Sequence, residues 1–401
     1  MKNIIQLITL IALVFTANTA LAKGGGKPPP APEPSLMNVI TVSPMYGDFT
    51  SPVEAINSIL DASAINPYLI QIGPGVYELG TRQIVMKEWV TIQGSGQDAT
   101  KITGLVSSGS EGPLSAIVVG SDDAAISNMT IENTGGAVSI AIYNFHASPR
   151  IEQVNAIASG TSSAYGIYNS NDCSPIITNV IATASANSIA SVGVLNFSNS
   201  SPSMTNVTAS GSGGLYAHGI RNLTLSSPTM TNVTAEGIDG ETSTNGVLNE
   251  DSSSPRMINV TATASSSGAY TNSGVYNDNS SPTMINVTAN ASGGIHSIGV
   301  FSLNGSSPVM TGVIASASGG TYNYGANSSD NATPFIQDSI LEGVRTEETN
   351  SFGVFISENS PGTRVVNNKI INGIYNDADG SQCRGNYDAD LVDVPCKIIS
   401  Q

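Results

Sequence analysis

Apolar and polar residues recur along this chain with one period, which proline marks. Ser-Pro or Thr-Pro pairs follow one another at intervals of 26 or 27 residues, with prolines at Pro149, Pro175, Pro202, Pro228, Pro255, Pro282, Pro308, Pro334 and Pro361. In most units Ile or Met stands two residues after proline, Val five after and Ala seven after, as in Met204, Val207 and Ala209. Residues two apart on a strand face the same side, so the pattern predicts a strand whose Val and Ala point into a core.

Each unit also predicts a second strand, as at residues 193–196, 246–249 and 274–277. Repetition at this length indicates a solenoid, which grows by stacking equal units along one axis. The period is too long for a hexapeptide β-helix and lacks the Leu pattern of leucine-rich repeats. We therefore expect an all-β, single-stranded right-handed parallel β-helix of about 26–27 residues per coil.

Asparagine stands four residues after proline in five successive units. Asn tolerates positive φ, and stacking of like on like would let each amide bond to its equivalent one coil away. The sequence thus predicts a structural Asn ladder at Asn179, Asn206, Asn232, Asn259 and Asn286.

A single amphipathic helix is predicted ahead of the strands. Ser51 is the expected N-cap, Pro52 the first helical residue and Glu54 the partner in a capping box. Apolar residues then recur at helical spacing as far as Leu60, and Asn66-Pro67 is the expected end. Such a helix would cover the open first coil.

The N-terminal residues predict export. Residues 1–22 match a signal peptide, with Lys2, an apolar run and Ala20-Leu21-Ala22 before the cleavage point. Residues 23–36 form a Gly/Pro-rich linker, and residues 37–401 the β-helix: capping helix and irregular coils at 37–146, regular repeats at 147–375 and a C-terminal cap at 376–401. No later apolar run is long enough for a membrane span, which leaves the periplasm, the cell surface or the medium open.

Cysteine and aspartate raise two possibilities near the C-terminus. Cys383 and Cys396 close a short loop in an exported chain, so they are candidates for a disulfide. Cys173 replaces a residue that is Ser in most other units and is expected to be a small structural side chain. No cofactor is predicted, although Asp377, Asp379, Asp388, Asp390 and Asp393 leave weak calcium binding open against a solvated tail.

Charge limits the partners. The formal net charge is -16, which argues against a nucleic-acid surface and makes long-range attraction to polyanionic polysaccharides unfavourable unless a local basic cleft exists. Polysaccharides or cell-surface glycans remain candidate partners, and the oligomeric state stays open.

The segment from 38 to 104 resembles a known family. Gly47-Asp-Phe-Thr50, the capped helix, Tyr68-Leu-Ile-Gln-Ile-Gly-Pro-Gly-Val-Tyr77 and Val90-Thr-Ile-Gln-Gly-Ser-Gly96 are similar to the opening of pectin methylesterases in the pectin-lyase-like superfamily. The resemblance implies a right-handed parallel β-helix and an ancestry among polysaccharide-active proteins.

The catalytic motifs of that family are missing, so no catalytic residue is assigned. Gln-Asp-Thr, Asp-Phe-Ile-Phe-Gly and Arg-Pro-Trp do not occur. Asp122-Asp123 and His218-Gly-Ile-Arg221 weakly resemble polygalacturonase motifs. Arg221, Arg256 and Glu250-Asp251 supply the residue types of a lyase without its spacing. Charged loops that keep a rod soluble explain these residues better than catalysis does.

Two functions remain. The regular units favour a non-catalytic surface or secreted protein that recognises glycans or cell surfaces through flat Ser/Thr/Asn faces. The alternative is a polysaccharide-processing enzyme, a pectinesterase-like carbohydrate esterase or a polysaccharide lyase.

Overall fold

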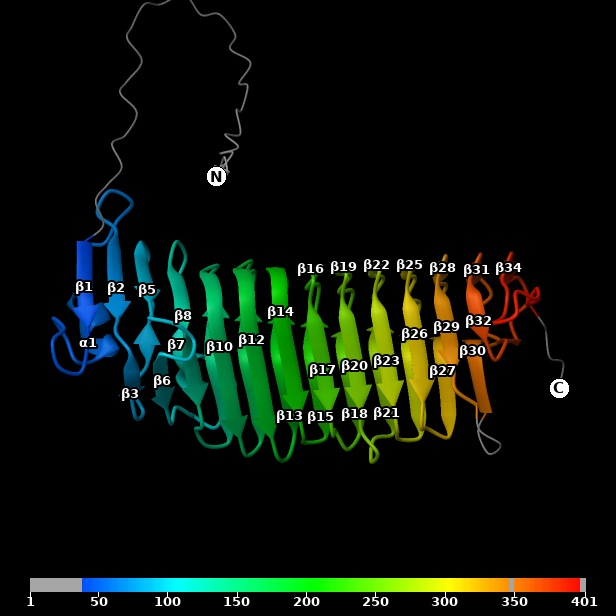
Figure 1. The fold of residues 1–401 in the computed structure, drawn as a ribbon, viewed down its shortest axis with the longest axis horizontal. Helices are drawn as coiled ribbons and strands as arrows, with labels where there is room; N and C mark the ends of the chain where they lie inside the picture. The colour runs from blue at the N-terminus through cyan, green and yellow to red at the C-terminus, as the bar shows by residue number, and fades with distance from the viewer. Residues whose placement is uncertain (1–37, 346–349, 397–401) are drawn as a thin grey trace, which may run out of the picture. The chain divides into compact units, whose positions relative to one another are not determined.

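The computed structural model describes residues 38–345 and 350–396, and it is built almost wholly from parallel strands in two sheets (Figure 1). Sheet B contains 12 strands, one from each successive coil. They are β4 (Ile84–Val85), β7 (Ala116–Val119), β9 (Val138–Phe145), β11 (Ser163–Ser170), β13 (Ala190–Phe197), β15 (Tyr216–Leu223), β18 (Ser243–Asn249), β21 (Thr271–Asp278), β24 (His296–Leu303), β27 (Tyr322–Ser328), β30 (Asn350–Ile356) and β33 (Ile374–Asn376).

Sheet A contains 22 strands, because most coils contribute two short strands to it or one long strand. They are β1 (Asn38–Val42), β2 (Tyr68–Ile72), β3 (Gly75–Glu78), β5 (Val90–Gln93), β6 (Thr100–Gly104), β8 (Ala125–Asn133), β10 (Arg150–Gly160), β12 (Ile176–Ala186), β14 (Ser203–Ser212), β16 (Thr229–Thr231), β17 (Thr234–Ile238), β19 (Arg256–Ile258), β20 (Thr261–Ser265), β22 (Thr283–Ile285), β23 (Thr288–Ser292), β25 (Val309–Thr311), β26 (Ile314–Ser318), β28 (Phe335–Gln337), β29 (Ile340–Gly343), β31 (Arg364–Val366), β32 (Lys369–Ile371) and β34 (Gln382–Arg384).

The strand register confirms the coil length predicted from proline. Ser203 pairs with Thr229, Thr229 with Arg256 and Arg256 with Thr283, which are steps of 26, 27 and 27 residues. Together with the all-parallel pairing, this establishes the predicted right-handed parallel β-helix.

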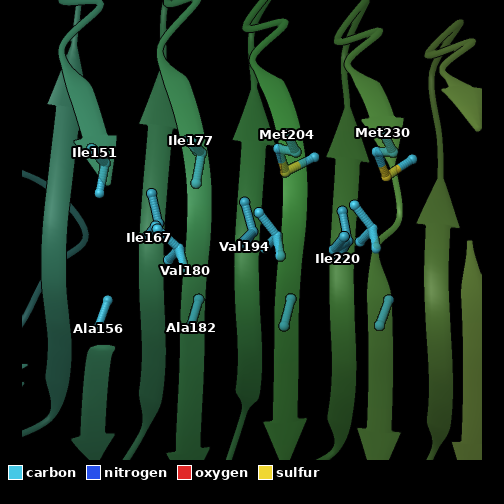
Figure 2. Close-up of a cluster of buried hydrophobic side chains, with 14 of the residues drawn as sticks. Ile151, Ala156, Ile167, Ile177, Val180, Ala182, Val194, Met204, Ile220 and Met230 are labelled. Atoms are coloured by element: carbon cyan, nitrogen blue, oxygen red, sulfur yellow. The ribbon is translucent and has the colours of Figure 1, made fainter. Parts of the chain in front are cut away.

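The interior is lined by the apolar positions of the repeat. Residues two, five and seven after proline are buried in one continuous core, as Met204, Val207 and Ala209 illustrate. Figure 2 shows these side chains stacked from coil to coil, with sheet B contributing Ile167, Val194 and Ile220. Because the regular coils place side chains of similar size at the same positions, this core is filled without aromatic rings over the described residues between 147 and 375.

The predicted Asn ladder lies along an exposed corner of sheet A. The backbone φ of its five members is 52° to 55°, the left-handed conformation that turns the strand. Asn206 donates to Asn179 over 3.0 Å, and the same bond repeats from Asn232 to Asn206 and from Asn259 to Asn232. In the coil directly after Asn286, the equivalent position is Gly312, with a φ of 63°, where a Cβ would lie 2.8 Å from the Asn286 amide oxygen.

A second Asn ladder, which the sequence did not predict as one, runs through the interior of sheet B. From Asn144 to Asn249, each side-chain amide donates to the side-chain oxygen of the Asn in the next coil over 2.7 to 2.9 Å, and all of these side chains are buried. Its members are Asn144, Asn169, Asn196, Asn222, Asn249 and Asn277. Buried amides are costly unless paired, so this ladder holds neighbouring coils in one register.

Hydroxyl groups pair the coils at the Ser-Pro turn. The Ser226 hydroxyl accepts the backbone N–H of Ser200 over 3.1 Å, and the Ser200 hydroxyl accepts that of Cys173 over 3.3 Å. Cys173 takes the Ser position, is buried and is not bonded to another cysteine, which agrees with the predicted role of a small side chain.

The N-terminal helix is shorter than predicted. α1 spans Pro52–Ser58 and begins after Ser51, but no side-chain capping hydrogen bond forms, so the expected capping box is wrong. The chain becomes extended at Ile59, which is buried, and Leu60 is 91% exposed. Ile56 and Ile59 already pack against the apolar core, so the residues after Ile59 have no further core surface to cover.

The last proline of the repeat is also out of phase. Phe335, directly after Pro334, pairs with Arg364, so Thr363 rather than Pro361 occupies the equivalent position. The segment predicted as the C-terminal cap contains β34, which pairs with β31 and so continues sheet A. Cys383 in β34 is joined to Cys396 by a disulfide, with the Cα atoms 5.3 Å apart.

We predict that Asn222→Ala lowers the free energy of unfolding by about 2–5 kcal/mol, because it leaves one buried donor and one buried acceptor unpaired. Asn232→Gly, in the exposed ladder, keeps the positive φ and should cost about 1 kcal/mol or less, because water replaces its partners. Urea unfolding of both variants is the measurement, and equal losses would contradict the distinction between the two ladders.

Candidate functional site

The outer face of sheet B is organised by a glycine in most of its strands. At Gly219 a Cβ would lie 2.6 Å from the carbonyl carbon of Ala235 in β17, so only glycine allows the two sheets to approach this closely. The residue before the glycine and the second residue after it line the outer face, as His218 and Arg221 do in β15. We call this surface the sheet B groove.

Tyrosine rings and one carboxylate form the N-terminal end of the groove. Tyr168 of β11 packs against Tyr165 of the same strand and against Tyr143 of β9, with ring centroids 5.1 and 5.2 Å apart. Both β11 hydroxyls donate to the carboxylate of Glu111. Glu111 lies in the connection between β6 and β7, just before the short 3-10 helix η1 (Pro113–Ser115). This connection thus reaches across two coils to the groove.

The centre of the groove is a pocket of about 420 Å³ formed by β15, β18 and β21. At its wall the Arg221 Nε donates to the Glu250 carboxylate over 2.8 Å, with the side chains 30% and 24% exposed. The lining residues are Tyr216, His218, Arg221, Ser243, Asn245, Leu248, Glu250 and Tyr276. Polar, charged and aromatic groups therefore meet within one hollow.

A buried amide in this pocket has unused hydrogen-bonding capacity. The Asn245 Nδ2 donates to the Ser243 hydroxyl over 3.0 Å and lies 3.3 Å from the Nδ1 of His218. The Asn245 Oδ1 has no partner, although the residue is only 1% exposed. An unpaired buried acceptor is costly, and a hydroxyl group of a bound ligand would satisfy it.

Burial sets the protonation of the pocket. Burial, together with the nearby positive charge of Arg221, lowers the pKa of His218 to about 3, so the imidazole is neutral at ordinary pH. Burial also raises the pKa of Tyr276 to about 12, assisted by the negative charges of Asp278, Glu250 and Asp330. The phenol therefore keeps its proton and remains a hydrogen-bond donor.

Aromatic rings continue beyond the pocket toward the C-terminus. Tyr276 packs edge-on against Phe301 with centroids 5.1 Å apart, and Phe355 stacks on Tyr375 at 4.9 Å. Tyr324 packs against Phe355 at 4.9 Å. The groove is thus bordered by rings at both ends of its polar centre.

The structure brings together only some of the residues considered from sequence. Arg221 lies beside Glu250 and His218, whereas Arg256 lies on sheet A and Asp251 in an exposed turn. The Asp122 carboxylate accepts the Ser148 backbone N–H and belongs to a turn. If the units had been aligned on the glycines of sheet B instead of on the prolines, the residues that line the groove would have been identified from the sequence.

Residues 38–345 and 350–396 contain neither a metal-binding cluster nor a membrane-spanning helix. No group of three or more His, Cys, Asp or Glu side chains there is placed to hold a metal ion, and this range includes the C-terminal aspartates. No helix in the same range is long and apolar enough to cross a bilayer. The predicted signal peptide and linker lie outside the described residues.

Solved structures similar to this chain share its fold. The A-module of mannuronan C-5 epimerase AlgE6 from Azotobacter vinelandii has a TM-score of 0.59 and 17% identity, covering 84% of this chain and 94% of that one. The AlgE4 A-module of the same organism has a TM-score of 0.48 and 14% identity over 88% and 96% of the two chains. Pectin methylesterase from Yersinia enterocolitica has a TM-score of 0.32 and 12% identity over 86% and 95%.

No protein-family model and no curated protein sequence matches this chain. The fold is that of the pectin-lyase-like right-handed parallel β-helix proteins. The AlgE6 module is a mannuronan epimerase by name, but at 17% identity the likeness establishes the fold and not the activity.

We predict that His218 makes the folded protein less stable in acid. The unfolded imidazole takes a proton below its ordinary pKa of 6.5, whereas the folded one stays neutral until about 3. Its contribution is therefore complete above 6.5 and is lost as the pH falls toward 3. His218→Asn, which places there the residue type found one coil later, should lose less stability between pH 7 and pH 5 than the unaltered protein. Urea unfolding at both values measures the difference, and identical pH dependence would contradict the assignment.

Proposed function

We propose that this protein binds a polysaccharide chain along the sheet B groove, with the Arg221–Glu250 pocket as the polar centre of the site. The observation that carries the proposal is that Asn245, whose buried Oδ1 has no hydrogen-bond partner, is one of the residues lining a pocket that also contains Tyr216 and Tyr276. Sugars combine apolar ring faces with hydroxyl groups. A hollow with both rings and unsatisfied polar atoms suits that chemistry.

The dimensions of the groove favour a polymer over a single sugar. From β11 to β21 the groove crosses five adjacent strands. At about 4.8 Å per strand this is roughly 19 Å, room for several linked sugars. The aromatic rows beyond the pocket extend the same surface in both directions.

The sheet B groove is a better candidate than the flat faces of Ser, Thr and Asn on sheet A. On sheet A the exposed amides of Asn179, Asn206 and Asn232 already bond to one another. A ligand would have to compete with these bonds, whereas Asn245 has a free acceptor. Recognition of glycans is thus proposed for sheet B alone.

Chemical processing of the bound chain is the second candidate function. It is favoured by the grouping of a neutral His218, a protonated Tyr276 and the Arg221–Glu250 pair in one pocket. A neutral imidazole accepts a proton and a phenol donates one, which are the parts of acid–base chemistry. The similar AlgE6 module is an epimerase of mannuronan, a polysaccharide. Against this, a pKa of about 3 makes His218 a weak base.

Export is part of the proposal. Cleavage of the predicted signal peptide would release residues 23–401 outside the cytoplasm, where structural polysaccharides are accessible. The acidic balance of the chain, with a net charge of -16, suits a soluble protein that meets its ligand by contact chemistry rather than by long-range attraction.

For binding, we predict that Tyr276→Ala weakens retention of the bound polysaccharide about tenfold or more, as buried aromatic contacts in binding sites usually do. Isothermal titration or affinity electrophoresis against the same polysaccharide gives the ratio of the dissociation constants of the variant and the unaltered protein. Phe335→Ala is the matched control, because Phe335 lies on sheet A, where its ring stacks under Arg364. Equal loss in both variants would place the ligand elsewhere.

For processing, we predict a product that survives dilution and disappears on boiling when residues 23–401 are incubated with a panel of plant and bacterial polysaccharides. Mass spectrometry would record new fragments and lost methyl or acetyl groups, and nuclear magnetic resonance would record changed sugar configuration. If the groove is catalytic, Tyr276→Phe abolishes the product and spares binding. Retention without any product would eliminate the second candidate.

A further inference from the structure

The charges around the sheet B groove are predominantly negative. Glu111 stands at its N-terminal end, Glu250 in the pocket wall, and Asp278 and Asp330 act on Tyr276 from the C-terminal side. Among the residues that line the pocket, Arg221 is the one cation. A polyanion entering the groove would meet more like charges than opposite ones.

Arg221 is already engaged. Its Nε donates to the Glu250 carboxylate at 2.8 Å, and the pair is partly buried, so neither charge is fully solvated. Transferring the guanidinium to a carboxylate on a ligand would leave Glu250 without its partner in a site of reduced solvation, which is unfavourable. The pair therefore acts as a neutral, fixed group of polar atoms.

The unsatisfied atom of the pocket also selects by hydrogen-bond type. The Asn245 Nδ2 is directed at two partners, His218 and Ser243, so the oxygen is the end left free. An amide oxygen only accepts hydrogen bonds, so it favours a ligand with hydroxyl groups, while the choice between neutral and acidic sugar chains is set by the surrounding charges. A sugar hydroxyl supplies the donor that this oxygen needs.

We infer that the sheet B groove takes an uncharged polysaccharide, whose hydroxyl groups donate to the Asn245 oxygen, and discriminates against chains of uronic acids. The inference rests on the proposed binding function and adds the substrate class. It separates this chain from a polysaccharide-binding protein in which a basic cleft would attract carboxylated polymers.

The test uses pairs of polymers that differ in charge and share a backbone. Mannan is paired with mannuronan, and fully methyl-esterified pectin with de-esterified pectin, each titrated onto residues 23–401 at low and high salt. The expected result is at least tenfold tighter binding of the uncharged member in any pair that binds. High salt should narrow the ratio, because it screens the repulsion.

Glu250→Gln makes the test specific to the groove. It removes one negative charge and frees Arg221, so binding of the carboxylated member should improve about tenfold relative to its uncharged partner. Glu236→Gln is the matched control, since it removes the same charge from β17 on sheet A, where Glu236 is partly exposed. Circular dichroism and thermal unfolding establish that both variants are folded.

The outcomes separate the two proposals. Preference for the carboxylated member of both pairs would overturn the inference and leave the binding function intact. An identical response of the two Glu→Gln variants would overturn the role given to the groove charges. Absence of binding to all four polymers and to a wider panel of neutral glycans would overturn the binding function and the inference together.

Discussion

The left-handed backbone turn at one corner of each coil is the constraint on which the rest of this structure depends. From Asn128 to Asn367 a residue with φ near 50° to 60° recurs at this corner, and it is usually Asn, Asp or Gly because other side chains resist that conformation. Each turn redirects sheet A by the same amount, so every coil ends above the place where it began. In-register stacking, the continuous core and the straight row of outer positions all follow from this equal step.

The two Asn ladders depend on this equal step but contribute differently to the fold. On the exposed corner, the side chains of Asn179 to Asn286 satisfy one another while suiting the turn itself. In the interior, Asn144 to Asn277 are paired away from water, and a shift of register by one residue would bury six amides beside apolar groups. The first row thus favours the turn, and the second penalises every alternative alignment of the coils.

Sequence periodicity predicted the scaffold well because the scaffold is local and repetitive. Proline spacing predicted the coil, and Met204, Val207 and Ala209 predicted its inner face. The groove was harder to predict. Arg221 and Glu250 are 29 residues apart, which is one coil plus two residues, and neither stands at a repeat position where the same residue type recurs. Proline also misled at Pro361, where two extra residues restore the register at Thr363. Burial of Ile59 ended the helix early, which helical spacing alone could not indicate.

The connection that carries Glu111 marks a fixed point at one end of the sheet B groove, from which the distance to the pocket is measured in whole coils. The Glu111 carboxylate is tied to Tyr165 and Tyr168 in β11, while Arg221 lies two strands further along sheet B in β15 and Glu250 directly follows β18. Because every coil adds one strand of nearly constant width, gaining or losing a whole coil between these landmarks would change their separation by about 4.8 Å and alter neither one chemically. At the proposed polysaccharide site, duplication or deletion of a unit would therefore change the length of chain that fits between these landmarks without altering the contacts to any single sugar.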